Sequence, residues 1–191
     1  MLDIPGMSWE EIRTDIHPEV FTTRIDPDDK WIPETKYPSD TFYLLLGSLH
    51  IVYIIELVYS DGTYQRQAVS HADLLRWGID GDALRTFAAD EYSRFPPSPW
   101  KRASCMGIVY EPPDFTKLWT NDLLNPDFPA TLKLKGRPLL TVPRTDYFII
   151  TGDRDLCGRR SQKRLTRDTA PVGIPLIARS LVFDGGTWQE H

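Results

Sequence analysis

Apolar residues between positions 49 and 69 follow the pattern of two strands joined by a turn. The stretch IVYII at 51–55 is continuously apolar, which is typical of a strand covered on both faces. Asp61 and Gly62 interrupt the apolar pattern with a dipeptide that favours tight hairpin turns. The sequence therefore predicts a hairpin with strands near 50–59 and 63–69, the first of them central in its sheet.

A different spacing of apolar residues begins at residue 69, in VSHADLLRWGIDGDALRTFAADEYSRF. Ser70 is a suitable cap for a first helix, and Gly78 is a suitable left-handed stop. Asp80 can cap a second helix. That helix has an apolar stripe on one face, made of Leu84, Phe87, Ala88, Tyr92 and Phe95. We expect two short helices joined at a tight corner.

Such a helix pair could read DNA or could simply pack against a sheet. A DNA-reading helix needs basic side chains that face phosphates. Between residues 70 and 95, five acidic side chains oppose the three arginines Arg76, Arg85 and Arg94. The acidic balance favours packing, with Trp77 filling the core at the end of the first helix.

The remaining apolar patterns predict one more helix and further strands, so the sequence indicates the α+β fold class. The stretch TKLWTNDLL at 116–124 predicts a helix, and two apolar stretches within 132–143 and 146–153 predict strands. Residues 177–183 predict a last strand or a corner, followed by a turn at Asp184-Gly185-Gly186. We expect a mostly antiparallel sheet with the helix pair packed on one face.

The first 40 residues differ from the rest in their proline content. Prolines recur every five to nine residues from Pro18 to Pro38, which excludes a long helix and disfavours a central strand. Ser8 and Glu11 have the spacing of a capping box, so a short helix is expected there. We interpret residues 1–40 as a proline-rich, ordered N-terminal arm held by aromatic side chains, and residues 41–191 as a single domain.

Composition and charge narrow the class of protein. The chain shows no secretory signal pattern, and Gly47, Ser48, His50 and Glu56 break its longest apolar stretch, so no membrane span is expected. Two cysteines do not make a disulfide framework, which favours a cytoplasmic location. Residues 1–100 carry 17 acidic and 8 basic side chains, whereas residues 101–191 carry 10 acidic and 14 basic ones.

The densest basic run is RRSQKRLTR at 159–167, which contains no acidic residue. Its cations are Arg159, Arg160, Lys163, Arg164 and Arg167. A cluster of one sign can mark a binding surface for an anionic partner. Alternatively, the run pairs with the acidic N-terminal half of the same fold. We expect the run to stay exposed and mobile unless acids elsewhere pair with it.

No pattern in the sequence requires a metal or a cofactor. The four histidines are scattered without ligand spacing, so neither a zinc site nor any other metal site is expected. Asp153 and Asp155 alternate in TGDRD and could hold Mg²⁺, but aspartates are also favoured in turns for their local hydrogen bonds. Cys105 lacks a nucleophile motif around it.

Three stretches within residues 40–191 form a recognisable order: VSHADLLRWGIDGDALRTFAADEY, GRPLLTVPRTDYFIITGD and PLIARSLVFDGGTW. Together they resemble the YtpQ-like family of bacterial proteins. Tyr92 stands where the family often has asparagine, and PRTD inserts one residue between Arg144 and Asp146. Because the family has no settled activity, the resemblance implies a fold rather than a function.

The sequence thus favours a non-catalytic accessory factor that binds another protein, such as a component of a bacterial defence or toxin-immunity system. Aromatic side chains in irregular segments suit a binding surface: Trp31, Trp100, Trp119 and Trp188. We predict partner binding by the basic run together with Trp119 and Trp188. Two alternatives remain: a Mg²⁺-dependent hydrolase or nuclease using Asp153 and Asp155, and nucleic-acid binding through Arg159–Arg167.

Overall fold

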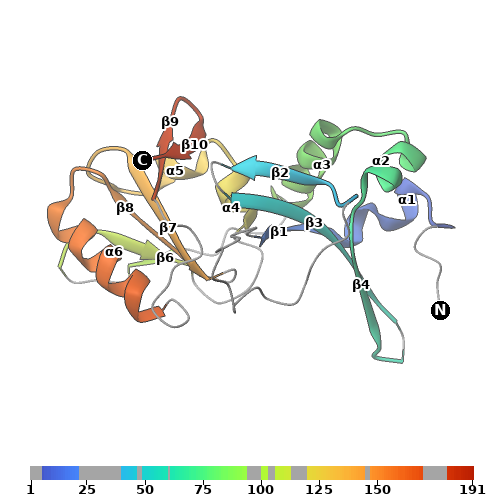
Figure 1. Cartoon of the computed structure of the whole chain (residues 1–191), viewed down its shortest axis with the longest axis horizontal. Coiled ribbons are helices and arrows are strands. Elements are labelled where there is room, and N and C mark those ends of the chain that lie inside the picture. The colour runs from blue at the N-terminus through green and yellow to red at the C-terminus, as the bar shows by residue number, and fades with distance from the viewer. Residues whose placement is uncertain are drawn as a thin grey trace, which may run out of the picture.

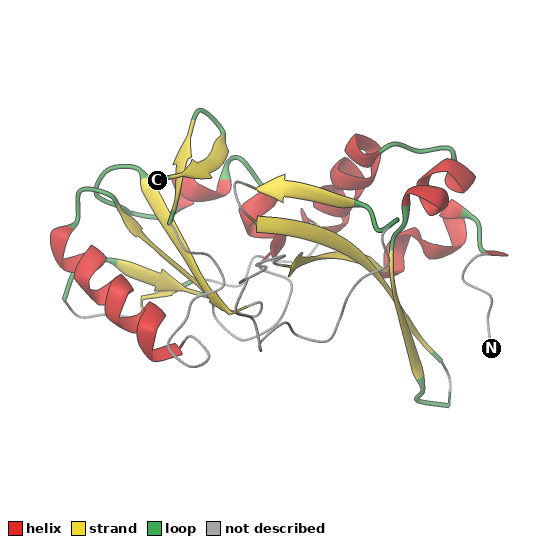
Figure 2. Ribbon diagram, viewed as in Figure 1, coloured by secondary structure: helices red, strands yellow, loops and turns green. Residues whose placement is uncertain are grey.

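The structure is a computed structural model that describes residues 6–21, 40–46, 49–59, 61–93, 100–102, 106–112, 120–144, 147–169 and 180–191. It contains two antiparallel sheets side by side, each with helices against it (Figures 1 and 2). The α+β class is therefore confirmed, although the strands form two sheets rather than one. Among the described residues, no helix combines the length and apolarity needed to cross a membrane.

The first sheet is built around one long central strand, as the apolar run predicts. Strand β3 (Leu49–Val58) pairs with β1 (Ile16–Phe21) along one edge. Along its other edge it pairs with β2 (Tyr43–Leu46) and β4 (Tyr64–Ala68). The β3–β4 hairpin confirms the predicted turn at Asp61 and Gly62, and it extends away from the sheet (Figure 1).

The helix pair α2 (His71–Trp77) and α3 (Gly81–Ser93) packs on one face of this sheet, as predicted. The Ser70 side chain accepts a hydrogen bond from the Asp73 amide at the start of α2. Gly78 ends α2 at a φ of 69°, a left-handed conformation that glycine adopts without strain. Leu84 and Ala88 of α3 are buried in one core cluster with Tyr53 of β3. Trp77 is half-buried and packs against this core cluster, so it lies at the edge of the core rather than inside it.

The N-terminal residues 6–21 join this sheet instead of standing apart from it. The Ser8–Glu11 capping box begins α1 (Trp9–Ile12), which leads through a 3₁₀ turn, η2 (Arg13–Asp15), into β1. Pro18 is tolerated there because β1 lies at the sheet edge, where a strand needs backbone bonds on one side only. Residues 22–39, with the other arm prolines, Trp31 and Tyr37, lie outside the described part of the chain.

The second sheet has the strand order β10-β9-β7-β8-β6-β5. Its strands are β5 (Lys101–Arg102), β6 (Val109–Glu111), β7 (Pro138–Arg144), β8 (Tyr147–Gly152), β9 (Leu181–Asp184) and β10 (Thr187–Glu190). Strands β7, β8 and β9 match predicted positions, and the β9–β10 hairpin turns at Gly185 and Gly186 as expected. Two short helices, α4 (Thr120–Leu124) and α5 (Phe128–Thr131), lie between the sheets (Figure 1).

One apolar core is shared by the two sheets. It combines side chains of the first sheet, of α4 and α5, and of the second sheet: Leu46, Leu49, Ile51, Leu123, Phe128, Leu140, Val142, Phe148, Ile150, Leu181 and Trp188. Burial of apolar surface on this scale stabilises the fold by holding the sheets together. The opposite face of the second sheet is covered by the long helix α6 (Leu156–Thr169), which was not foreseen from the sequence.

Candidate protein-binding surface

Helix α6 is attached to its sheet mainly by hydrogen bonds. The buried Gln162 side chain donates to the carbonyls of Leu139 (2.8 Å) and Ile149 (3.0 Å), on two adjacent strands. Ser161 donates to the carbonyl of Met106, and the Thr166 hydroxyl lies 2.9 Å from that of Thr141. Because buried polar groups that pair in this way are costly to leave unpaired, α6 is held in one orientation.

Gly158 lets the first turn of α6 approach the sheet closely. A β-carbon at this position would lie 2.3 Å from the Thr151 hydroxyl oxygen and 2.9 Å from the carbonyl oxygen of Ile108. No larger side chain fits without moving the helix. The polar anchors and this close approach together determine which face of α6 is turned outward.

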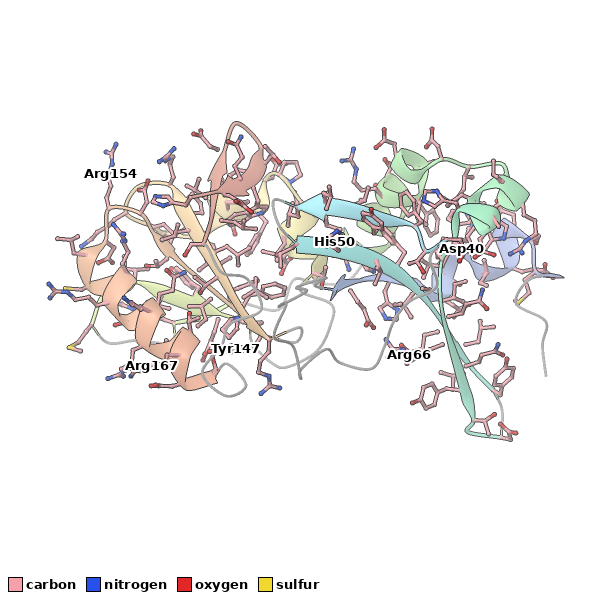
Figure 3. The ribbon with its side chains drawn as sticks, viewed as in Figure 1. Asp40, His50, Arg66, Tyr147, Arg154 and Arg167 are labelled. Carbon is pink, nitrogen blue, oxygen red and sulfur yellow. The ribbon has the colours of Figure 1, made fainter. Side chains whose placement is uncertain are left out.

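The outward face of α6 carries all five cations of the basic run. Their spacing of one, three, one and three residues follows helical periodicity, so they line one side of the helix: Arg159, Arg160, Lys163, Arg164 and Arg167. All five are exposed, and we call them the basic face. Figure 3 shows Arg154 and Arg167 near opposite ends of α6.

Within the described part of the chain, the basic face has few counter-charges. Arg167 contacts its neighbour Asp168 at 3.2 Å, and no described carboxylate forms an ion pair with the other four cations. Several described acids of the N-terminal half pair with cations of that same half, as Asp73 does with Arg76 and Glu56 does with Arg66. The structure therefore offers no support for pairing of the run with that half, and it shows an ordered helix where a mobile segment was expected.

Two exposed apolar side chains lie beside the N-terminal end of the basic face. Leu156, the first residue of α6, is 69% exposed, and Met106 is 64% exposed. The hydrogen bond from Ser161 to the Met106 carbonyl places Met106 next to the helix. The surface thus combines cations with a small apolar patch, a mixture found at protein interfaces.

Asp155 acts as a structural cap for α6. Its carboxylate accepts the amides of Gly158 (2.9 Å) and Ile108 (2.8 Å), and its residue is buried. The hydrogen bond from the Gly158 amide, followed by that from Ile108, lowers the pKa of Asp155 below its usual value. The charged form of Asp155 is therefore more stable in the folded chain than in the unfolded one.

We predict that Asp155→Asn lowers the free energy of unfolding by about 1–2 kcal/mol at pH 7, since it removes charge-assisted capping bonds. A lowered folded pKa contributes stability above the unfolded pKa, and this stability is lost as pH falls through the folded pKa. The difference between Asp155→Asn and the natural chain should thus shrink at acidic pH. Urea denaturation at neutral and acidic pH measures it, with the exposed Asp168→Asn as the control. A difference that is independent of pH would contradict the capping role.

Asp153 is engaged separately from Asp155. One of its carboxylate oxygens accepts the Arg137 amide at 2.9 Å, and the other lies 3.0 Å from the Arg137 guanidinium. Arg137 also contacts Asp184 at 2.8 Å, which links the open end of the β7–β8 pair to the β9–β10 hairpin. The two aspartates are both committed to protein donors, as expected for residues of a structural turn.

The structure places the tryptophans predicted at the binding surface in different environments. Trp188 is only 2% exposed, and its ring nitrogen donates to the Leu123 carbonyl at 3.0 Å. The prediction that it contacts a partner is wrong, because its position on the inner face of β10 places it in the shared core. Trp100 is half-buried and donates to Asp122. Trp119 and Trp31 lie outside the described residues.

No family model, curated protein or solved structure matches this chain. The resemblance to the YtpQ-like family therefore stays a prediction. The candidate surface rests on the geometry of α6 alone, and a sequence signal for it exists: the cations at 159–167 recur with the period of a helix.

Proposed function

We propose that this chain is a non-catalytic accessory protein that binds an acidic surface of another protein through the basic face of α6. The observation that carries the proposal is the alignment of five exposed cations on one side of a firmly anchored helix. A pre-oriented surface loses little conformational entropy on binding, which favours affinity. Arginines form four of the five cations, and their planar guanidinium groups suit two-point contacts with carboxylates.

The composition of the chain and of the surface favours a protein over a nucleic acid as the partner. The whole chain has a net charge of −5, which opposes long-range association most strongly for a nucleic acid, because its phosphate charges are so dense. Exposed Leu156 and Met106 give the surface an apolar component that phosphate groups do not use but a protein partner can cover. The charges then mainly speed association and orient the partner, while the apolar contacts slow dissociation.

The enzyme alternative has less support in the described residues. A Mg²⁺ site at Asp153 and Asp155 needs free carboxylate oxygens that converge, whereas these carboxylates accept hydrogen bonds from Arg137, Gly158 and Ile108. We propose that the chain is an accessory or immunity-type factor and that its basic face contacts a cytoplasmic bacterial protein.

The experiment that tests the proposal is retention of partners at low salt on the immobilised chain, before and after nuclease treatment of the extract. We expect an acidic protein to be retained after nuclease treatment and to be released as salt rises, because exposed charges are screened. Loss of all retained material after nuclease treatment would overturn the proposal in favour of nucleic-acid binding. Retention that does not change between low and high salt would also overturn it.

A further inference from the structure

A group of ionisable side chains lies on the first sheet, far along the fold from α6. His17 and Glu19 are two residues apart on β1, so their side chains share one face of the sheet. Strand β3 places Glu56 on the same face, because His17 pairs with Ile54 and alternate residues of a strand face the same way. Among the described residues, these three form the one group whose side-chain atoms are close enough to hold a metal ion.

The separations of the three ligand atoms suit a small divalent ion. The His17 Nε2 atom lies 3.0 Å from a Glu19 carboxylate oxygen and 3.5 Å from a Glu56 carboxylate oxygen. All three ligand atoms lie within 4.8 Å of one another. A tetrahedral zinc ion bonded at roughly 2.0–2.1 Å holds its ligands roughly 3.3 Å apart. The group therefore needs only a small rotation of one glutamate to close around zinc.

Arg66 shows that this position already attracts a cation. Its guanidinium contacts Glu19 and also lies 3.7 Å from Glu56, from the neighbouring strand β4. Arg66 and Glu56 are each about one-third exposed, so the arginine can turn into solvent when another cation takes its place. The labelled side chain of Arg66 in Figure 3 lies beside the β3–β4 hairpin, away from the helices.

We propose that His17, Glu19 and Glu56 bind one divalent ion, zinc or a similar metal, which displaces the Arg66 guanidinium from the two carboxylates. This proposal revises the expectation of no metal site, which rested on the scatter of the histidines along the sequence. The three side chains are 23%, 13% and 36% exposed, so a fourth position faces solvent and takes a water molecule. Because the ligands come from β1 and β3, the ion clamps the edge strand to the sheet.

Titration of Zn²⁺ into the full-length chain, purified without a histidine tag, tests the site. We expect one equivalent to bind and the melting temperature to rise, because an ion that binds only the folded state stabilises it. His17→Asn and Glu56→Gln should each weaken binding at least tenfold. His191→Asn, which removes the imidazole of the exposed C-terminal residue, is the control and should leave the affinity unchanged.

Arg66→Ala separates a metal site from a purely structural salt bridge. If the arginine competes with the ion, its removal should tighten Zn²⁺ binding several-fold, while the same change lowers stability in the absence of zinc. The proposal is overturned if no zinc binds, if His17→Asn and Glu56→Gln bind as well as the natural chain, or if Arg66→Ala weakens binding. Glu56→Gln alone decides the matter if His17→Asn fails to fold, because Glu56 is on the sheet surface.

Discussion

Trp188→Ala is expected to lower the free energy of unfolding by about 3–5 kcal/mol, as truncation of a buried tryptophan does in well-packed cores. The ring is almost fully enclosed, and it contacts Phe183 edge-on with 5.2 Å between ring centroids. Its Nε1–H bond to the Leu123 carbonyl ties β10 to α4, so truncation also removes the donor of that carbonyl. Urea denaturation measures the change in the free energy of unfolding. It is followed by far-ultraviolet circular dichroism, which reports the backbone and not the tryptophans.

Trp188→Phe is the matched variant for this prediction. Phenylalanine keeps an aromatic ring in the shared core but lacks the donor for Leu123, so we expect a smaller loss of stability than for alanine. Partner binding by Trp188→Phe should equal that of the natural chain. A loss below about 1 kcal/mol for Trp188→Ala, together with weaker partner binding, would return this residue to the interface.

The double change Arg160→Glu with Arg164→Glu is expected to abolish partner binding while leaving the melting temperature nearly unchanged. Both side chains are exposed, and neither forms an ion pair with a described carboxylate, so the fold does not depend on them. Reversal turns two attractive contacts with an acidic partner into repulsive ones, and each like-charge contact at an interface is costly. Calorimetric titration with the retained partner and a thermal melt of the same sample provide the two readouts.

The control carries the same change in net charge at positions away from α6. Arg85 on α3 and Lys133 after α5 are both exposed, so Arg85→Glu with Lys133→Glu tests net charge alone. We expect this control to bind with an affinity close to that of the natural chain. If the α6 variant instead melts at a much lower temperature and still binds, the basic run has a structural role.

The elements that the sequence predicted well are those with local signals. Ser70 and Gly78 carry the start and stop of α2 within nine residues, and the turn at Asp61 and Gly62 is equally self-contained. The apolar run of β3 reflects cover on both faces. Each of these signals depends on neighbours in the sequence, so it can be interpreted without knowledge of the fold.

Helix α6 could not be found by its apolar pattern, because it has almost none. Its buried positions are Gly158, Ser161, Gln162 and Thr166. Gln162 and Thr166 pair with groups of strands distant in the sequence, and Ser161 pairs with the distant carbonyl of Met106. The helical period of α6 is carried by its charged residues, so a search for apolar stripes does not detect the helix.

The proposed metal site of His17, Glu19 and Glu56 was not predicted from the sequence, for a related reason. His17 and Glu56 meet only through the pairing of β1 with β3, which no short-range pattern encodes. Likewise, the outcome for Trp188 depended on which face of β10 turns inward, and that strand was not foreseen.

The most direct measurement of the central claim is zero-length carbodiimide cross-linking of the complex, followed by mass spectrometry. Carbodiimide joins a lysine amine to a carboxylate that touches it, and Lys163 is the one lysine of α6. If the basic face docks an acidic protein, Lys163 should be joined to an aspartate or glutamate of the partner. Cross-links from Lys133 to the partner, with none from Lys163, would contradict the claim.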